Sequence, residues 1–322
     1  MLQPAPAASA DRRPATMHRI VREGGKGMRR RPLHAVLLAG LLLPLAMAVH
    51  AVEAIDDRGI RVELPRPPQR IVSLMPSLTE TVCALGACER LVGVDDYSSW
   101  PPSVAALPHV GGLEDARVEA IVALQPDLVL VPLSSRALPR LQALHLPVLS
   151  LEPRTLRDVR RVLQVLGPVL QSGDPDTVWQ DINREVQMAA RTLPPRLRGM
   201  RVYVEVGSTP FAASEGSFIG ELLMRLGAEN IVPAALGPFP KLNPEFVVRA
   251  DPQVIIVERT DAAGLRARPG WQGIEALRRN RVCALDPEQM NVLMRAGPRL
   301  GAAAHLLVDC LEGRLAAGGP GR

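Results

Sequence analysis

The sequence predicts an α/β protein whose two halves each hold a parallel sheet and are joined by one long helix. Three observations lead to this prediction. Short apolar runs of strand length alternate with amphipathic helical patterns, which is typical of parallel sheets. The same alternation starts again after residue 200. Between the two series lies a stretch from Asp176 to Thr192 that contains neither Gly nor Pro.

In the first half, apolar runs bounded by turn residues predict buried strands, and the segments between them have helical periodicity. The predicted strands are Arg70–Met75, Leu91–Val94, Leu128–Val131 and Val148–Leu151, and the predicted helices are Leu78–Leu85, Val118–Leu124 and Leu156–Leu166. Ser77-Leu-Thr-Glu80 has the spacing of a capping box, which predicts the start of the first helix.

The second half repeats this organisation. The predicted strands are Arg201–Val206, Val254–Val257 and Val282–Leu285, and the predicted helices are Phe218–Leu226 and Pro298 to about Leu311. Because helices again separate the strands, we expect a second parallel sheet.

The connecting helix has clear start and stop signals. Asp174 is a suitable N-cap, Pro175 fits the first helical position, and Pro194 and Pro195 end the pattern. About 18 residues at 1.5 Å each span roughly 27 Å, enough for one helix to bridge two lobes. We therefore expect an N-terminal lobe over residues 69–172, a bridging helix over 173–195 and a C-terminal lobe over 196–318.

The N-terminal segment resembles a secretory signal peptide. Three arginines follow Met28, an apolar run extends from Ala35 to Ala48, and small residues follow it. The apolar run of about 14 residues is shorter than the roughly 20 that a membrane-spanning helix needs. We expect residues 1–48 to be a leader in which 1–27 reflect a mis-assigned start. The signal peptide would then be 28–48 or 28–51, and no Cys follows that would take a lipid anchor.

The net charge of +5 belongs to this leader. Residues 1–48 hold eight of the 38 basic residues and two of the 33 acidic ones, so residues 49–322 carry a net charge of −1. No arginine cluster is interleaved with aromatic side chains, which argues against nucleic acid as a partner.

An exported protein can use disulfides, and the chain holds four cysteines, Cys83, Cys88, Cys283 and Cys310. Three connectivities are open. The pairing of Cys83 with Cys88 and of Cys283 with Cys310 is preferred because each bridge then stays within one half.

Two glutamates occupy matching places in the two halves. Glu119 and Glu245 each begin a helical pattern and stand seven residues before a Pro that leads into a buried strand. One explanation is a sequence pattern common to helix–strand units, because Glu is favoured in the first turn of a helix. The other is that the pair faces a partner with two-fold symmetry.

The signatures of common enzyme classes are missing. The chain contains no GxSxG, no HExxH, no GxxxxGKS/T and no GxGxxG after a strand, and its six histidines stand apart. We therefore expect no catalytic residues, no metal site and no permanently bound cofactor.

Four of the nine aromatic residues fall in predicted loops: Tyr97, Trp100, Phe211 and Phe239. Loops that follow the strands of an α/β sheet are where such folds place ligands. Scattered surface aromatics are the simpler reading. A ligand cleft between the lobes, lined by both, accounts for the pattern better.

Several motifs resemble the periplasmic substrate-binding proteins of ABC importers that have a helical backbone, and the cobalamin-binding branch most closely. The similar segments include RIVSLMPSLTETVCALGACERLVGVDDYSSWPPSV, LPHVGGLEDARVEAIVALQPDLVLV, FPKLNPEFVVRADPQVIIV and RAGPRLGAAAHLL, within residues 69–311. This resemblance implies two Rossmann-like lobes, one bridging helix, a cleft between the lobes and little closure on binding.

The resemblance also implies roles for single residues. Tyr97, Trp100, Phe211 and Phe239 match pocket aromatics. Asn291 and Arg295 match polar positions of the pocket. Glu119 and Glu245 match acidic residues that dock onto arginines of the permease.

There are departures from the pattern. Leu113 occupies a pocket position where the cobalamin branch tends to carry Trp, and Leu226 and Val308 replace a cysteine pair known in the family. A corrin ring can still rest on apolar surface, and its cobalt brings its own axial ligands.

The sequence thus predicts a monomeric periplasmic protein that captures a corrinoid, cobalamin, as transported ligand and delivers it to an ABC importer permease dimer. The alternatives are a ferric siderophore or haem as ligand. A secreted α/β hydrolase or metal enzyme and an adhesion module are rivals from other classes.

Overall fold

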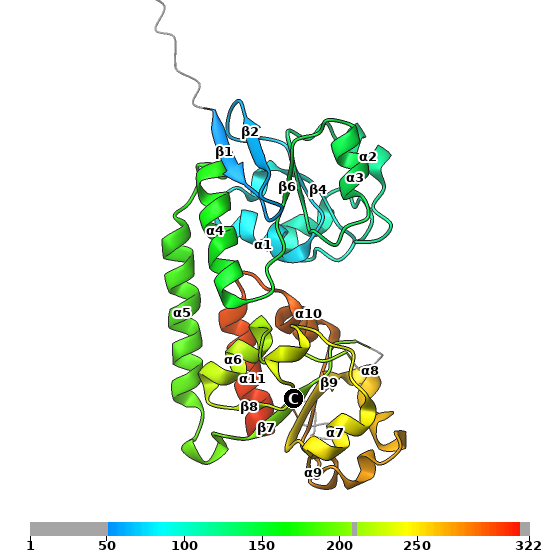
Figure 1. The fold of residues 1–322 in the computed structure, drawn as a ribbon. Helices are drawn as coiled ribbons and strands as arrows, with labels where there is room; N and C mark the ends of the chain where they lie inside the picture. Colours follow the sequence, from blue (N-terminus) through cyan, green and yellow to red (C-terminus); the bar gives the residue numbers. More distant parts are fainter. Residues whose placement is uncertain (1–50, 208–210, 316–322) are drawn as a thin grey trace, which may run out of the picture. The chain divides into compact units, whose positions relative to one another are not determined.

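A computed structural model describes residues 51–207 and 211–315 (Figure 1). The first sheet has the strand order β4-β3-β5-β6, with every pair parallel. Its strands are β3 (Ile71–Ser73), β4 (Leu91–Val94), β5 (Leu128–Val131) and β6 (Val148–Ser150). Each lies within a predicted strand, which confirms the parallel α/β prediction for the first half.

The second sheet has the order β10-β9-β7-β8 and is also parallel. Its strands are β7 (Arg201–Val204), β8 (Glu229–Asn230), β9 (Val254–Glu258) and β10 (Val282–Leu285). Only the short β8 was missed, because two residues leave no periodic signal. Read from β8, the order β8-β7-β9-β10 repeats β4-β3-β5-β6, so the two sheets share one topology.

Helices cross between the parallel strands because a tight turn cannot join them. The helices of the first half are α1 (Pro76–Ala84), α2 (Val118–Ala123), α3 (Leu138–Ala143) and α4 (Leu156–Leu170). Those of the second half are α6 (Phe218–Leu226), α7 (Pro244–Ala250), α8 (Arg259–Ala262), α9 (Glu275–Arg278), α10 (Pro287–Met294) and α11 (Leu300–Glu312). The described part of the chain contains no helix that is long and apolar enough to cross a membrane.

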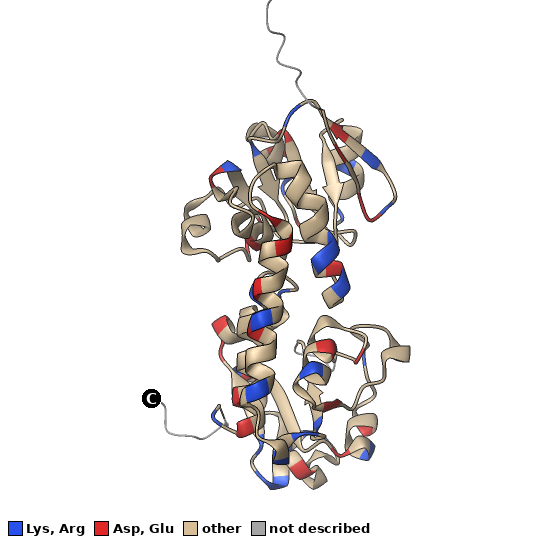
Figure 2. Ribbon diagram, turned by 90° about the vertical axis from the view of Figure 1, so that its left-hand side faces the viewer, with Lys and Arg blue, Asp and Glu red and all other residues tan. Residues whose placement is uncertain are grey.

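Helix α5 (Pro175–Thr192) forms where the sequence predicts it. Asp174 caps it by accepting hydrogen bonds from the backbone N–H groups of Asp176 and Thr177. The helix packs on α4, α6 and α11, and a Cβ on Gly301 would lie 2.4 Å from the Cβ of Glu185, so only Gly allows α11 this approach. Charged residues of both signs alternate along α5 (Figure 2). Its role as a bridge between lobes stays a prediction.

An antiparallel hairpin precedes the first sheet and was not predicted. It consists of β1 (Val52–Ile55) and β2 (Arg61–Leu64). Asp57 N–H donates to the Ser150 carbonyl on β6, and the Asp57 carboxylate pairs with Arg161 on α4. These contacts attach the hairpin to the first half. The predicted leader, residues 1–48, lies outside the described residues.

The predicted capping box at Ser77 and Glu80 is wrong. Helix α1 begins earlier, with Met75 as N-cap and Pro76 at the first position. Ser77 therefore lies inside the first turn, and its buried hydroxyl has no hydrogen-bond partner. The Glu80 side chain instead contacts two arginines from the end of the chain.

Both preferred disulfides form. Cys83 on α1 is bonded to Cys88, and Cys283 on β10 is bonded to Cys310 on α11. The second bridge is buried and ties the edge strand β10 of the second sheet to α11, the last described helix.

Removing the two disulfides should cost different amounts of stability. The free energy of unfolding should fall by about 3–4 kcal/mol in Cys283→Ala/Cys310→Ala but only about 2 kcal/mol in Cys83→Ala/Cys88→Ala, because loop-closure entropy grows with loop length. Urea unfolding of both double variants under oxidising conditions measures the difference. A larger loss for the short bridge would contradict the entropic explanation.

Candidate functional site

Two predicted ligand residues lie on one exposed turn after β4, residues 95–101, which we call the aromatic loop. Tyr97 is 68% exposed and Trp100 is 42% exposed. Large aromatic side chains usually bury most of their surface. Their exposure on a loop at the carboxyl end of a parallel strand is therefore the pattern expected of ligand contacts.

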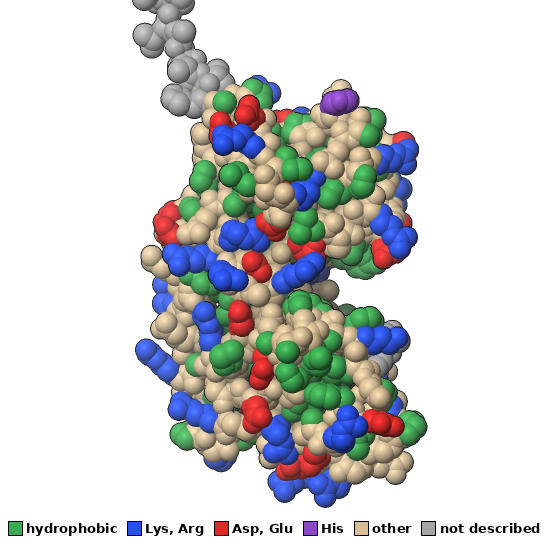
Figure 3. Space-filling model, in the orientation of Figure 1, with side chains coloured by type: hydrophobic (Ala, Val, Ile, Leu, Met, Phe, Trp, Pro, Cys, Tyr) green, Lys and Arg blue, Asp and Glu red, His purple; other side chains and the backbone are tan. Residues whose placement is uncertain are grey.

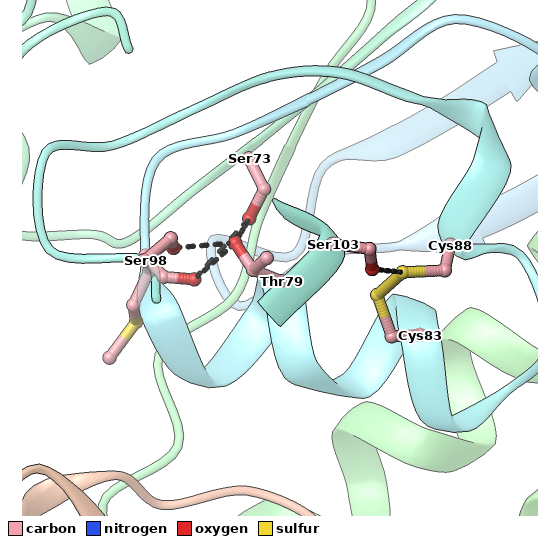
Figure 4. Close-up of a disulfide and its surroundings, with 7 residues drawn as sticks. Ser73, Thr79, Cys83, Cys88, Ser98 and Ser103 are labelled. Carbon is pink, nitrogen blue, oxygen red and sulfur yellow. Dashed lines mark hydrogen bonds between the residues drawn. A yellow bond between two sulfur atoms is a disulfide. The ribbon is translucent and has the colours of Figure 1, made fainter. Parts of the chain in front are cut away.

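The aromatic loop is anchored to α1 by buried hydroxyl groups. The Thr79 hydroxyl donates to Ser73 Oγ at 2.9 Å and also lies 2.9 Å from Ser98 Oγ (Figure 4). Further along α1, the Cys83–Cys88 bridge places Cys88 Sγ 3.9 Å from Ser103 Oγ, just after the loop. Helix α1 thus contacts the loop at Ser98 and, through the disulfide, the segment just after the loop.

Asp95 anchors the same loop with a buried carboxylate. It accepts hydrogen bonds from Tyr97 N at 2.8 Å and from the Ser98 hydroxyl at 2.5 Å. Burial raises the pKa of Asp95, and the two hydrogen bonds and the charge of Arg295 only partly oppose that rise. The folded protein therefore favours the protonated carboxyl more than the unfolded chain does.

Leu113 lies next to Tyr97. A Cβ on Gly112, the residue before Leu113, would lie 3.1 Å from the Tyr97 ring, so the ring packs closely against this glycine. The Ser135 hydroxyl, from the loop after β5, reaches the Leu113 carbonyl at 3.5 Å. Leu133 in that loop is also exposed. It extends the apolar surface but was missed, because a single Leu after a strand carries no signal.

The structure also brings the second pair of aromatics together. The backbone of residues 211–214 runs alongside residues 238–241, with an antiparallel bridge between Phe211 and Lys241. Phe211 is exposed, whereas Phe239 is half-buried in edge-to-face contact with Phe218, with centroids 5.9 Å apart. Hydrophobic side chains gather over the segment between α6 and α7 in Figure 3, where Leu236 is exposed.

A buried ion pair that sequence reasoning missed lies below Phe211. Glu205 directly follows β7, is fully buried, and receives two hydrogen bonds from Arg268, at 2.6 and 2.7 Å. The hydrogen bond to Glu205 is the main reason why the pKa of Arg268 is raised. Arg268 also stacks over Trp271, 4.5 Å from the ring centroid.

The two polar positions implied by the resemblance differ in their surroundings. Asn291 is half-buried on α10. Arg295 is only 6% exposed and donates to Glu80 Oε1 at 2.8 Å, to the Tyr97 carbonyl at 2.7 Å and to Ser99 Oγ at 3.2 Å. Its guanidinium is thus engaged with protein atoms.

Glu119 and Glu245 take equivalent positions in the two sheets' topology. Each is the second residue of its helix, α2 or α7, and each helix leads through a left-handed residue and a Pro into the matching strand, β5 or β9. Both side chains are exposed, and each pairs with one exposed arginine, Arg140 or Arg249.

Two open pockets of the described structure lie elsewhere. One of about 760 Å³ is lined by α5, α10 and α11 and includes Arg299 and His305. A second of about 400 Å³ lies among α4, α5 and α6, around Trp179. Neither pocket is lined by a predicted ligand residue. Within residues 51–207 and 211–315, no group of three His, Cys, Asp or Glu side chains could hold a metal ion.

The raised pKa of Asp95 predicts a pH-dependent effect of Asp95→Asn. The protonated Asp95 carboxyl contributes fully to the free energy of unfolding below its pKa in the unfolded chain, about 3.9. This contribution is lost as the pH rises through the higher pKa of the folded state. The amide stays neutral, so the stability of Asp95→Asn relative to the native protein should rise as the pH increases above about 4. Urea unfolding across this range measures it, and a constant difference would show that Asp95 is not desolvated.

Comparisons with known proteins agree on the family. Residues 71–289 match the model of the family described as "Periplasmic binding protein". The vitamin B12-binding protein of Pectobacterium atrosepticum is 31% identical over 258 residues, which cover 76% of this chain and 88% of that protein.

Solved structures share the fold. The periplasmic haem-binding protein of Roseiflexus sp. RS-1 has 27% identity and a TM-score of 0.61 over 76% of this chain and 97% of that one. The periplasmic vitamin B12-binding protein of Vibrio cholerae has 24% identity and a TM-score of 0.61 with the same coverage. With two parallel sheets of matching topology, the chain belongs to the periplasmic binding protein family, as a solute-binding protein of an ABC importer.

Proposed function

We propose that the protein captures a corrinoid, cobalamin, in the periplasm and delivers it to the permease dimer of an ABC importer. The observation that carries this proposal is that curated relatives 28–31% identical over about three quarters of the chain are named vitamin B12-binding proteins. The proposal includes export by a cleaved signal peptide, a monomeric protein and no permanently bound cofactor.

The exposed side chains suit a flat, largely uncharged ring. Tyr97, Trp100 and Leu113 from the first half and Phe211 from the second are all exposed. Stacking on aromatic faces needs no charge complementarity. A ferric siderophore with negative charge would favour free arginines, yet Arg295 is engaged by Glu80 and by the aromatic loop. This favours a corrinoid over a siderophore.

Haem is the second candidate, and one observation favours it. The exposed Tyr97 presents a phenol oxygen, and a tyrosine can serve as an axial ligand of haem iron. Cobalamin needs no such ligand from the protein, because its cobalt carries axial ligands of its own. Binding of haem through its iron would therefore need the Tyr97 hydroxyl group, whereas binding of cobalamin would not.

Tyr97→Phe separates the two ligands. The variant keeps the aromatic ring and removes only the hydroxyl, so cyanocobalamin affinity should stay within about twofold, whereas Tyr97→Ala should weaken it about tenfold by loss of stacking area. Calorimetric titrations of the mature protein with cyanocobalamin, haem and a ferric siderophore measure both effects.

Leu144→Ala is the matched control, because Leu144 is equally apolar and exposed but lies at the amino end of β6, away from the aromatic loop. Its affinity should equal that of the native protein. Binding of haem but not of cyanocobalamin, abolished by Tyr97→Phe, would overturn the corrinoid assignment in favour of haem.

We propose that Glu119 and Glu245 dock onto basic residues of the permease. Both carboxylates are held at matching points of two sheets with the same topology, as a symmetric partner requires. Their pairs with Arg140 and Arg249 are exposed, and such pairs contribute about 0–1 kcal/mol. An arginine of the permease can therefore displace them at little cost.

The docking role predicts that Glu119→Ala/Glu245→Ala keeps its affinity for ligand but supports less permease-dependent uptake. Docking to the permease should weaken at least about tenfold, because two interfacial charge pairs are lost. Binding to permease in nanodiscs and uptake by proteoliposomes measure this.

Glu89→Ala/Glu229→Ala is the matched control. These two glutamates are also exposed: Glu89 lies two residues before β4, and Glu229 is the first residue of the equivalent strand β8. Loss of uptake in both double variants would indicate a general effect of removing acidic charge, and unchanged uptake in the first would refute the docking role.

A further inference from the structure

A buried carboxylate on α1 lies at the centre of a polar cluster that has no part in the roles considered so far. Glu80 is only 3% exposed. It accepts hydrogen bonds from Arg295 at 2.8 Å and from Arg299 at 3.0 and 2.7 Å. Burying three ionised groups is costly unless each is paired and hydrogen-bonded, so this arrangement depends on its geometry.

Both arginines extend from this carboxylate to the aromatic loop. Arg295 donates to the Tyr97 carbonyl at 2.7 Å and to Ser99 Oγ at 3.2 Å. The guanidinium carbon of Arg299 lies 5.2 Å from the centroid of the Trp100 ring, within the range of a cation–π interaction. One carboxylate therefore orients two guanidinium groups, and each of these contacts one aromatic residue of the loop.

The cluster joins segments from opposite ends of the chain. Glu80 is on α1, whereas Arg295 and Arg299 flank the turn between α10 and α11. A Cβ on Gly297, in that turn, would lie 3.3 Å from the Ser77 carbonyl oxygen of α1, so the turn is packed closely against the helix. The aromatic loop is thus held on one side by hydroxyl groups and on the other by these arginines.

We propose that Glu80, Arg295 and Arg299 form a positioning cluster that preorganises Tyr97 and Trp100 for the transported ligand. This inference rests on the proposed function. In it, Arg295 affects binding by holding the aromatic loop and does not contact the ligand. If the two aromatic side chains are held in place before the ligand binds, the entropic cost of binding is smaller.

Arg295→Lys tests the role of the fork-shaped guanidinium. Lysine keeps the charge beside Glu80, but one ammonium cannot bond in parallel to the carboxylate, the Tyr97 carbonyl and Ser99. Glu80→Gln tests the other side, because it removes the charge that orients both arginines while keeping the shape of the side chain.

The first readout needs no ligand. Acrylamide quenching of Trp100 fluorescence, isolated by subtracting the signal of Trp100→Phe in the same background, reports how firmly the loop is held. Quenching should increase at least about twofold in Glu80→Gln and Arg299→Lys, because a released loop exposes the indole ring. In Arg295→Lys, amide hydrogen exchange at Tyr97 and Ser98 should become faster.

Arg268→Lys is the matched control. It disrupts another arginine–carboxylate pair with a fully buried carboxylate, Glu205 in the second half, and should also lower the free energy of unfolding. It should leave quenching of Trp100 and exchange at Tyr97 unchanged. If it alters them as much as the cluster variants do, the effect is general destabilisation and the positioning role is refuted.

The second readout is ligand affinity. The Kd for cyanocobalamin should rise about tenfold in Arg295→Lys, the cost of ordering two loosened side chains on binding. Unchanged quenching, exchange and Kd in folded Glu80→Gln and Arg295→Lys would overturn the inference. If the loop is released in these variants but the native protein binds none of the three ligands, the proposed function fails while the positioning of the loop stands.

Discussion

The arrangement of this protein depends on one constraint of parallel sheets, which is that every connection between neighbouring strands must cross the sheet. The strands β3, β5, β7 and β9 are buried on both faces, and helices supply the apolar cover. Each crossover returns the chain to the same edge, so the loops after the strands gather at the carboxyl ends. Exposed aromatic side chains are found in these loops and nowhere else in comparable number.

The repeated topology extends this constraint to the exterior. Because β8-β7-β9-β10 repeats β4-β3-β5-β6, any residue that opens the helix before the third strand has a counterpart in the other half. Glu119 and Glu245 are such counterparts, although the sequences around them share little beyond a Glu, a Pro and an apolar strand. Equivalent placement follows from topology and needs no further similarity of sequence.

Polar groups packed against the aromatic loop anchor the surface that we propose for the ligand. On one side, Asp95, Thr79 and Ser98 form a hydrogen-bonded network that burial strengthens. On the other side, Glu80 holds two arginines against the loop. In our proposal, the exposed aromatic side chains and the buried polar groups that hold their loop form one site, in which the polar groups act without contacting the ligand.

The sequence by itself determined the parallel α/β class, seven of the ten described strands, the long helix, the disulfide preference and the placement of Tyr97, Trp100 and Phe211 in loops. These features depend on hydrophobic periodicity, turn residues and residues close together in the chain, all of which can be read directly from the sequence. The hairpin β1–β2 and the strand β8 were too short for such patterns. The capping box failed because Pro76 starts α1 one residue before Ser77.

Only the tertiary structure decided what Glu80, Arg295 and Glu205 do. Glu80 and Arg295 are 215 residues apart, and no local pattern distinguishes a carboxylate that caps a helix from one that receives two buried arginines. The burial that makes such a pair strong, and that raises the pKa of Asp95, is created by the packing of distant segments. Long-range electrostatics is therefore a property of the fold, whereas strand and helix placement is largely local.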